Sequence, residues 1–247
     1  MRRLGLYSLA VFVALAAQTA FAATHNPDAK TTAAIQSRIY HAKAFNHGQV
    51  QVAFEKGIAT LTGTVDNLGS KIDAERAARK VKGVAGVVNH INVSADDFSV
   101  QQMLERARKQ IVTYYAYGIF DNINLEAQGN KLIVSGEVTQ PYKRTDIGNF
   151  LTRVKGVAEV ENNLEVLPLS TYDDSIRIAV ARAIFGDPYF VYYANQAVPP
   201  IHIIVKNGNV TLEGVVNSRL DRAKADALAR SAGLSLSFAN NLRVERS

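Results

Sequence analysis

The hydrophobic and polar positions of the chain follow one pattern that is written three times. Each copy begins with hydrophobic residues at every second position, followed by a two-residue turn and a second alternating run. The hydrophobic triads are Val50, Val52 and Phe54; Ile123, Leu125 and Ala127; and Ile201, Ile203 and Val205. The turns are Lys56-Gly57, Gly129-Asn130 and Asn207-Gly208, whose residues accept the positive φ that two-residue hairpins need. A period of two is typical of a strand with one buried face, so each copy predicts a β-hairpin.

The second strand of each hairpin carries a glycine at one fixed position, which defines the spacing of the copies. These glycines are Gly63, Gly136 and Gly214, at steps of 73 and 78 residues. The same steps hold over a long stretch on either side of the glycine. A repeat of this period predicts a row of small modules rather than one continuous core.

A helix and a last strand follow each hairpin. Hydrophobic residues recur at helical spacing in Ala74, Ala77, Ala78 and Val81; Ile147, Phe150, Leu151 and Val154; and Ala225, Leu228, Ala229 and Ala232. This is one amphipathic stripe repeated. We expect the first two helices to end at Lys82-Gly83 and Lys155-Gly156 with a glycine C-cap, whereas Gly233 falls one position early. The last strands center on Asn89, Asn162 and Asn240, each flanked by alternating hydrophobic residues.

Each copy also opens with a helix. Its hydrophobic stripe is placed at Ala34, Ile35 and Ile39; at Leu104, Ala107, Ile111 and Tyr115; and at Ile176, Val180 and Ile184. On this phase Tyr115 is predicted to lie in the core. The fold class is therefore α+β, with three tandem αββαβ modules, each a three-stranded mixed sheet covered on one face by two helices. We place module 1 at residues 23–95, module 2 at 96–168 and module 3 at 169–247.

Residues 1–22 are predicted to be a cleavable signal peptide. Arg2 and Arg3 precede an apolar run, and Ala20-Phe21-Ala22 has the small-x-small form of a cleavage site. No segment of the mature chain is apolar over the ~20 residues that a membrane span needs. The mature chain has 26 basic and 22 acidic residues, a mild net charge of +4 that falls short of a nucleic-acid binder. There is no cysteine, which excludes disulfides and lipoprotein anchoring.

The hairpin glycine, the small-residue helix, the Val-Lys-Gly-Val turn and the Val-x-Asn-x-(Leu/Ile)-x-Val ending together resemble the BON domain, a family named for bacterial osmotic-shock and nodulation proteins. The resemblance covers about residues 28–247. It implies an αββαβ fold, a periplasmic location, and phospholipid or membrane-surface association that supports envelope integrity or stress tolerance. It also implies structural roles for Gly63, Gly136 and Gly214. A periplasmic protein-interaction or chaperone-like adaptor is the alternative function. Gly233 and a longer loop in the third copy depart from the pattern and leave the role of that copy open.

The sequence predicts no enzyme, no cofactor and no metal site. Cysteine is absent, there is no Gly-x-Ser-x-Gly elbow or phosphate loop, and no carboxylate pair recurs among the copies. His41, His47 and His90 are too loosely spaced to indicate a metal site. His202 lies on the polar phase of its strand, which favours exposure or an interface.

Two aromatic segments are candidates for binding an anionic phospholipid surface or an envelope protein. In the first, Arg108, Lys109, Tyr114 and Tyr117 combine cations with tyrosines, which favour membrane–water boundaries; the alternative is an ordinary core with a solvated face. The second segment, residues 185–200, contains Tyr192 and Tyr193 and is stiffened by prolines. We expect it to pack against module 2, and a binding edge is the alternative. The sequence does not determine the oligomeric state.

Overall fold

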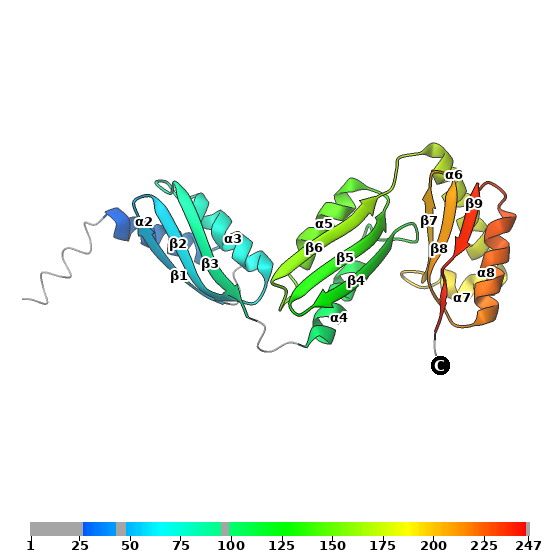
Figure 1. The fold of residues 1–247 in the computed structure, drawn as a ribbon, viewed down its shortest axis with the longest axis horizontal. Helices are drawn as coiled ribbons and strands as arrows, with labels where there is room; N and C mark the ends of the chain where they lie inside the picture. Colours follow the sequence, from blue (N-terminus) through cyan, green and yellow to red (C-terminus); the bar gives the residue numbers. More distant parts are fainter. Residues whose placement is uncertain (1–26, 43–47, 95–98, 246–247) are drawn as a thin grey trace, which may run out of the picture. The chain divides into compact units, whose positions relative to one another are not determined.

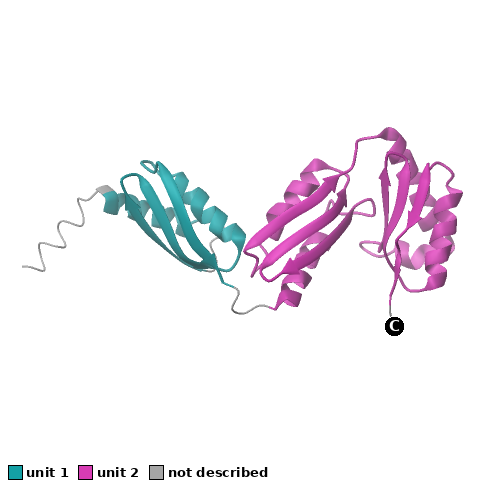
Figure 2. Cartoon of the chain, in the orientation of Figure 1, with its two compact units in different colours: residues 1–94 teal, residues 95–247 magenta. Residues whose placement is uncertain are grey.

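The structure of the protein is a computed structural model that describes residues 27–42, 48–94 and 99–245. The predicted signal peptide lies outside these residues. The chain divides into two compact units, residues 1–94 and 95–247 (Figure 2). The first unit contains module 1, and the second contains modules 2 and 3. Among the described helices, none is both long and apolar enough to span a membrane.

Modules 1 and 2 have the element order helix, strand, strand, helix, strand, and module 3 adds two short helices before its first strand and divides its last strand (Figure 1). Module 1 contains α2 (Pro27–Tyr40), β1 (Gly48–Glu55), β2 (Ile58–Val65), α3 (Leu68–Arg79) and β3 (Gly86–Val93). Module 2 contains α4 (Val100–Val112), β4 (Asn122–Gln128), β5 (Lys131–Val138), α5 (Pro141–Leu151) and β6 (Glu159–Val166). Module 3 contains α6 (Thr171–Phe185), a short 3₁₀ helix η1 (Pro188–Phe190), α7 (Val191–Ala194), β7 (Ile201–Lys206), β8 (Asn209–Val216), α8 (Arg219–Ser231), β9 (Ser237–Asn240) and β10 (Arg243–Val244).

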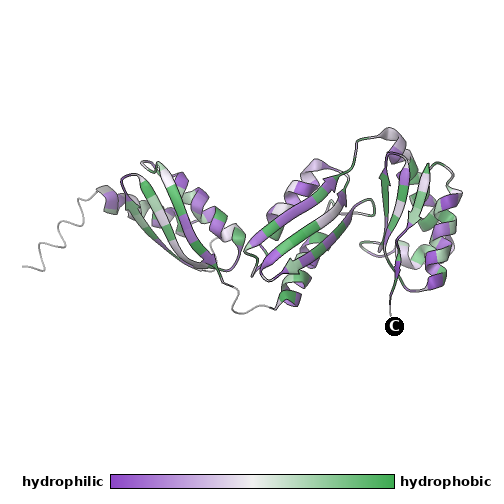
Figure 3. Ribbon diagram, in the orientation of Figure 1, coloured by the Kyte–Doolittle hydropathy of each residue, from purple (hydrophilic) through white to green (hydrophobic). Residues whose placement is uncertain are grey.

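The sheets are mixed, as predicted. In each module the first two strands pair antiparallel across the two-residue turn, and the last strand pairs parallel with the second. In module 3 the last strand is divided into β9 and β10, which both pair with β8. Hydrophobic and hydrophilic residues alternate along the strands, so one face of each sheet supplies the core (Figure 3).

Each module has its own hydrophobic core, built from the predicted stripes. Ile35, Leu61, Ala78 and Ile91 are fully buried in module 1, and equivalent positions form separate clusters in modules 2 and 3. The two longer helices of each module pack against one face of its sheet. The predicted fold class and the three-module organisation are therefore confirmed.

The three hairpin glycines are required by a close approach between strands. Gly63, Gly136 and Gly214 have φ between +114° and +120°, a region that side chains avoid. A Cβ on these glycines would lie 1.9, 2.1 and 1.9 Å from the carbonyl oxygens of Gln49, Asn122 and Pro200. The repeated glycine is thus a structural position in all three modules.

The asparagine of the last strand ties that strand to the preceding helix. Its side-chain amide donates to a helix carbonyl in each module: Asn89 to Lys71 at 3.1 Å, Asn162 to Arg144 at 2.9 Å, and Asn240 to Arg222 at 3.1 Å. Its side-chain oxygen accepts from the backbone N–H two residues on. The repeat in the sequence identifies the position of this asparagine but does not predict its hydrogen bonds.

Three sequence expectations are wrong in detail. Tyr115 is 88% exposed, because α4 ends at Val112 and the helical phase that would bury this ring stops there. Ala34 is also exposed, on the outer face of α2. The helices α3 and α5 end at Arg79 and Leu151, four or five residues before Gly83 and Gly156, whose positive φ serves a following turn instead. Only Gly233 lies directly after its C-cap.

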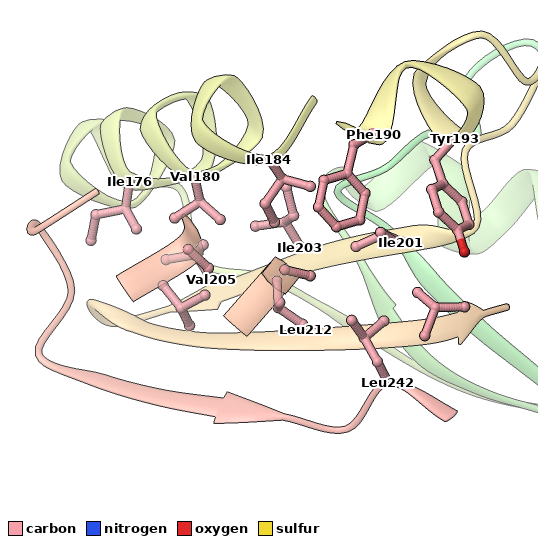
Figure 4. Close-up of a cluster of buried hydrophobic side chains, with 14 residues drawn as sticks. Ile176, Val180, Ile184, Phe190, Tyr193, Ile201, Ile203, Val205, Leu212 and Leu242 are labelled. Carbon is pink, nitrogen blue, oxygen red and sulfur yellow. The ribbon is translucent and has the colours of Figure 1, made fainter. Parts of the chain in front are cut away.

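The segment between α6 and β7 packs on its own module rather than on module 2. Phe190 is fully buried and Tyr193 is 4% exposed, and both belong to the module 3 core. Figure 4 shows their rings beside Ile184 and Ile201, pointing toward β7. The physical reason is their spacing of three residues across η1 and α7, which turns both rings to one side and fills the space beyond the end of α6.

Candidate functional site

The strongest candidate for a binding surface is the C-terminal end of α4. Ser99 caps the start of this helix with a capping box, and Met103, Ala107 and Ile111 bury its inner face. On its outer side, Val112 is 50% exposed and Tyr115 is 88% exposed. Arg108 and Lys109 are exposed beside them. We call Arg108, Lys109, Val112 and Tyr115 the α4-end surface.

The two cations of the α4-end surface are available to a ligand. Within the part of the chain that the structure describes, neither Arg108 nor Lys109 forms an ion pair. The Tyr115 ring lies 5.1 Å from the Tyr114 ring between centroids. The surface therefore combines unpaired positive charge with large exposed apolar groups.

Tyr114 and Tyr117 are engaged within the fold. The Tyr114 hydroxyl donates to Asp146 at 2.7 Å and its ring packs on Phe150. Burial, followed by the hydrogen bond to Asp146, raises the pKa of Tyr114. Tyr117 lies against the module 2 core, and burial raises its pKa as well. Of the four residues predicted in this segment, only Arg108 and Lys109 present their charged groups at the α4-end surface.

The chain between α4 and β4 is fixed by a buried ion pair. Asp121 is fully buried and accepts hydrogen bonds from the Lys143 Nζ at 3.0 and 2.8 Å. It also accepts from the backbone N–H groups of Gly118 and Thr139. Lys143 itself is 8% exposed and donates further to the Thr139 hydroxyl. This arrangement immobilises the segment 118–121.

The third residue of the helix that follows the hairpin is buried in every module, but the type of its side chain differs. It is Ser70 in α3, Lys143 in α5 and Asp221 in α8. In module 2 it anchors the preceding linker through Asp121, and in module 3 the Asp221 carboxylate accepts from the hydroxyls of Tyr189 at 2.6 Å and Tyr193 at 2.7 Å. The same helix position thus anchors the segment between the opening helix and the first strand in modules 2 and 3.

Modules 2 and 3 share an interface. The backbone N–H of Ile203 donates to the carbonyl of Ile119 at 2.7 Å, and Phe120 packs against the module 3 core. The rings of Tyr117 and His202 lie 5.6 Å apart between centroids. His202 is 8% exposed, so of its two predicted environments it occupies the interface. Burial lowers the pKa of His202, and the nearby backbone of Gly118 and Asp121 opposes this shift only in part.

A cavity of about 420 Å³ lies beside this interface, within the size range of ligand sites. Module 2 contributes Arg108, Ile111 and residues 122–125 to its lining. Module 3 contributes Glu213, Val215 and Arg243 among others. We call it the inter-module cavity. Arg243, like Arg108, forms no ion pair with a described residue.

The second predicted aromatic segment contributes little surface. Tyr193 is buried, donates to Asp221 and accepts from the backbone N–H of Asn217, and burial is the main cause that raises its pKa to about 12. Tyr192 is 66% exposed and remains available for contact. The described residues contain no group of three or more His, Cys, Asp or Glu side chains that could hold a metal ion. His47 lies outside those residues.

Sequence reasoning missed four residues of this region. The exposure of Val112 and Tyr115 was not predicted, because no glycine or proline marks the end of α4 in the sequence. Asp121 and Arg243 belong to no motif in the sequence, and only the fold brings them to Lys143 and to the inter-module cavity.

Comparison with known proteins identifies the repeat. Residues 27–95, 104–168 and 173–245 each match the family model described as the BON domain. No curated protein matches the sequence closely enough to serve as a relative.

Similar solved structures are distant. CdsD, a structural protein of the type III secretion system of Chlamydia trachomatis, is 14% identical, with 86% of this chain and 93% of that chain covered and a TM-score of 0.26. The periplasmic domain of PrgH, an inner membrane protein of the type III secretion system from S. typhimurium, is 14% identical, with 85% and 100% covered and a TM-score of 0.20. Values this low support no conclusion about function.

Proposed function

The chain belongs to the BON domain family, and on that basis we propose that it is a non-catalytic protein of the bacterial cell envelope that associates with anionic phospholipid surfaces. In this proposal the protein is exported to the periplasm through its signal peptide and supports envelope integrity or stress tolerance. The α4-end surface of module 2 is the contact region, and Tyr192 is a secondary candidate.

The observation that carries the proposal is the exposure of Tyr115 and Val112 beside two unpaired cations. Tyrosine at a membrane–water boundary buries its ring and keeps its hydroxyl hydrated. A lysine or arginine near an anionic surface contributes about 1 kcal/mol, so Arg108 and Lys109 together supply about 2 kcal/mol. Residues 96–168 contain eight basic and ten acidic residues. Attraction therefore arises from this local cluster and not from the net charge of the module, and binding is expected to be weak.

The test is co-sedimentation of the mature protein with vesicles of phosphatidylglycerol and phosphatidylcholine, compared with phosphatidylcholine alone. Binding to the anionic vesicles is expected at low salt and should fade by a few hundred millimolar salt, where the Debye length is below about 10 Å. The double variant Lys109→Gln/Tyr115→Ser should lose most of this binding. Lys82→Gln/Tyr40→Ser makes the same chemical change at exposed positions of module 1 and should bind as the unmodified protein does.

Three results would count against this function: equal binding to neutral vesicles, binding that persists at high salt, or loss of binding in the module 1 variant alone. Persistence at high salt would instead favour an apolar protein interface, as expected of a protein-interaction or chaperone-like adaptor.

A further inference from the structure

The first strand of every module lies at an edge of its sheet, where its outward backbone groups need partners. On β7, the N–H of Ile203 donates to Ile119 and the carbonyl of Val205 accepts from Arg177 at 2.7 Å. On β1, the carbonyl of Val50 accepts from the Gln36 side chain at 2.6 Å. The edges of modules 1 and 3 are thus partly covered by the protein itself.

The corresponding edge of module 2 is open. Residues two apart on a strand direct their backbone groups to the same side, and the register aligns Ile123 on β4 with Val50 and Ile201. Ile123 and Leu125 therefore direct their N–H and C=O groups away from β5. Among the described residues, no hydrogen bond comparable to those on β1 and β7 covers them. This open edge lies on the same sheet as β5 and β6 (Figure 1).

The residue that would cover this edge has a different role in module 2. Counted from the equivalent buried positions Ile35 and Ala107, the position of Gln36 is occupied by Arg108. Arg108 lines the inter-module cavity together with Asn122, Ile123, Asn124 and Leu125 of the open edge. Arg108 therefore occupies the position at which module 1 has Gln36, whose side-chain amide covers the strand edge.

The chemistry of the inter-module cavity fits an extended acidic chain. Ile111, Val112 and Val215 provide apolar walls, and Arg108 and Arg243 contribute unpaired guanidinium groups from the two modules. Glu213 also lines the cavity, but its carboxylate accepts from the Asn241 amide at 2.7 Å. Arginine binds carboxylates strongly and in a defined geometry.

We propose that the open edge of β4 captures an extended acidic segment of a partner protein as an added strand in the inter-module cavity. Backbone hydrogen bonds to Ile123 and Leu125 provide the affinity, and the two arginines select acidic side chains or a chain-terminal carboxylate, as in other cases of strand addition. The two sites share Arg108 and Val112, but this activity can be distinguished from membrane association because Arg243 lines the cavity and lies outside the α4-end surface.

The test uses an acetylated peptide of sequence Val-Glu-Val-Glu-Val-Glu and the full mature protein without lipid. The peptide should bind, and the amide exchange of Ile123 and Leu125 should slow when it does. Arg108→Gln and Arg243→Gln should each weaken binding by about tenfold, the size of one charge-assisted contact. Arg219→Gln alters an equally exposed arginine outside the cavity and should change nothing.

Two control peptides make the result decisive. A version with lysine in place of glutamate should not bind, and a version N-methylated at every residue should bind weakly, since none of its backbone N–H groups can pair with the edge. The proposal is overturned by no binding at about 1 mM peptide, by equal binding of the lysine version, or by unchanged exchange at Ile123 and Leu125. Arg243→Gln should leave vesicle binding intact, so the two functions fail independently.

Discussion

Replacing Lys143 with methionine should destabilise module 2 strongly. The substitution keeps a long apolar side chain but removes the Nζ, which donates to both oxygens of Asp121 and to the Thr139 hydroxyl. The carboxylate of Asp121 then stays buried at 1% side-chain exposure without its counter-charge. A buried charge deprived of its partner is among the most destabilising changes a protein can undergo.

The magnitude follows from what remains around Asp121. Removing one partner of a buried ion pair costs about 3–5 kcal/mol. Asp121 keeps hydrogen bonds from the N–H groups of Gly118 and Thr139 and from the Thr139 hydroxyl, at 2.9 to 3.1 Å. The lower end of the range therefore applies, and we expect a loss of about 3 kcal/mol in the free energy of unfolding. With an ordinary urea slope of about 1–3 kcal/mol/M, the midpoint should fall by roughly 1–3 M.

Urea unfolding of the mature protein measures this loss. Lys109→Met makes the same chemical change at an exposed position and should stay within about 0.5 kcal/mol of the unmodified protein. The double variant Asp121→Asn/Lys143→Met removes both charges and should recover part of the stability lost by Lys143→Met. A loss below about 1 kcal/mol for Lys143→Met, or no recovery in the double variant, would refute the assignment of this pair as the anchor of the linker.

Three further outcomes can be measured with the same unfolding assay. Gly136→Ala should cost at least about 2 kcal/mol, because the new Cβ meets a carbonyl oxygen at 2.1 Å, whereas Gly118→Ala enters open space and should be nearly neutral. Asn162→Leu should destabilise by about 1–3 kcal/mol through the lost tie to the Arg144 carbonyl. Burial lowers the pKa of His202 below its usual 6.5, so the stability contributed by its neutral ring is complete above pH 6.5 and is lost as pH falls through the folded pKa. Burial raises the pKa of Glu137, which changes the free energy of unfolding with pH in the opposite direction. The measurement is therefore the difference in unfolding free energy between the unmodified protein and His202→Gln. This difference should shrink as pH falls below 6.5, and a constant difference would contradict the prediction.

The fold could be predicted because its signals are local and repeated. Alternation at Ile201, Ile203 and Val205 and the turn Asn207-Gly208 each specify a strand or hairpin without distant information, and three copies in register reinforce one another. The site could be predicted only in part. Arg108 and Lys109 were found because tyrosines follow them in the sequence, whereas Arg243 joins Arg108 at the inter-module cavity through tertiary contacts that leave no mark in the local pattern.

Most of the errors arise at the ends of helices. The stripe of α4 was extended by one turn to Tyr115, but helix termini depend on capping and tertiary contacts more than on periodicity. The loop of module 3 was assigned to the wrong neighbour for a similar reason. Phe190 and Tyr193 lie on one side of a segment too short to show a helical period, so their burial is visible only in the folded module.

The most direct test of membrane association uses the absence of cysteine to place one label at a chosen site. Thr113→Cys puts an environment-sensitive fluorophore at the end of α4, and Asn130→Cys puts the same fluorophore at the hairpin turn beyond β4, both at exposed positions. On addition of phosphatidylglycerol vesicles at low salt, we expect a blue shift at position 113 and little change at position 130. A shift at position 130 alone, or none at either position while the protein co-sediments, would show that the α4-end surface is not the contact.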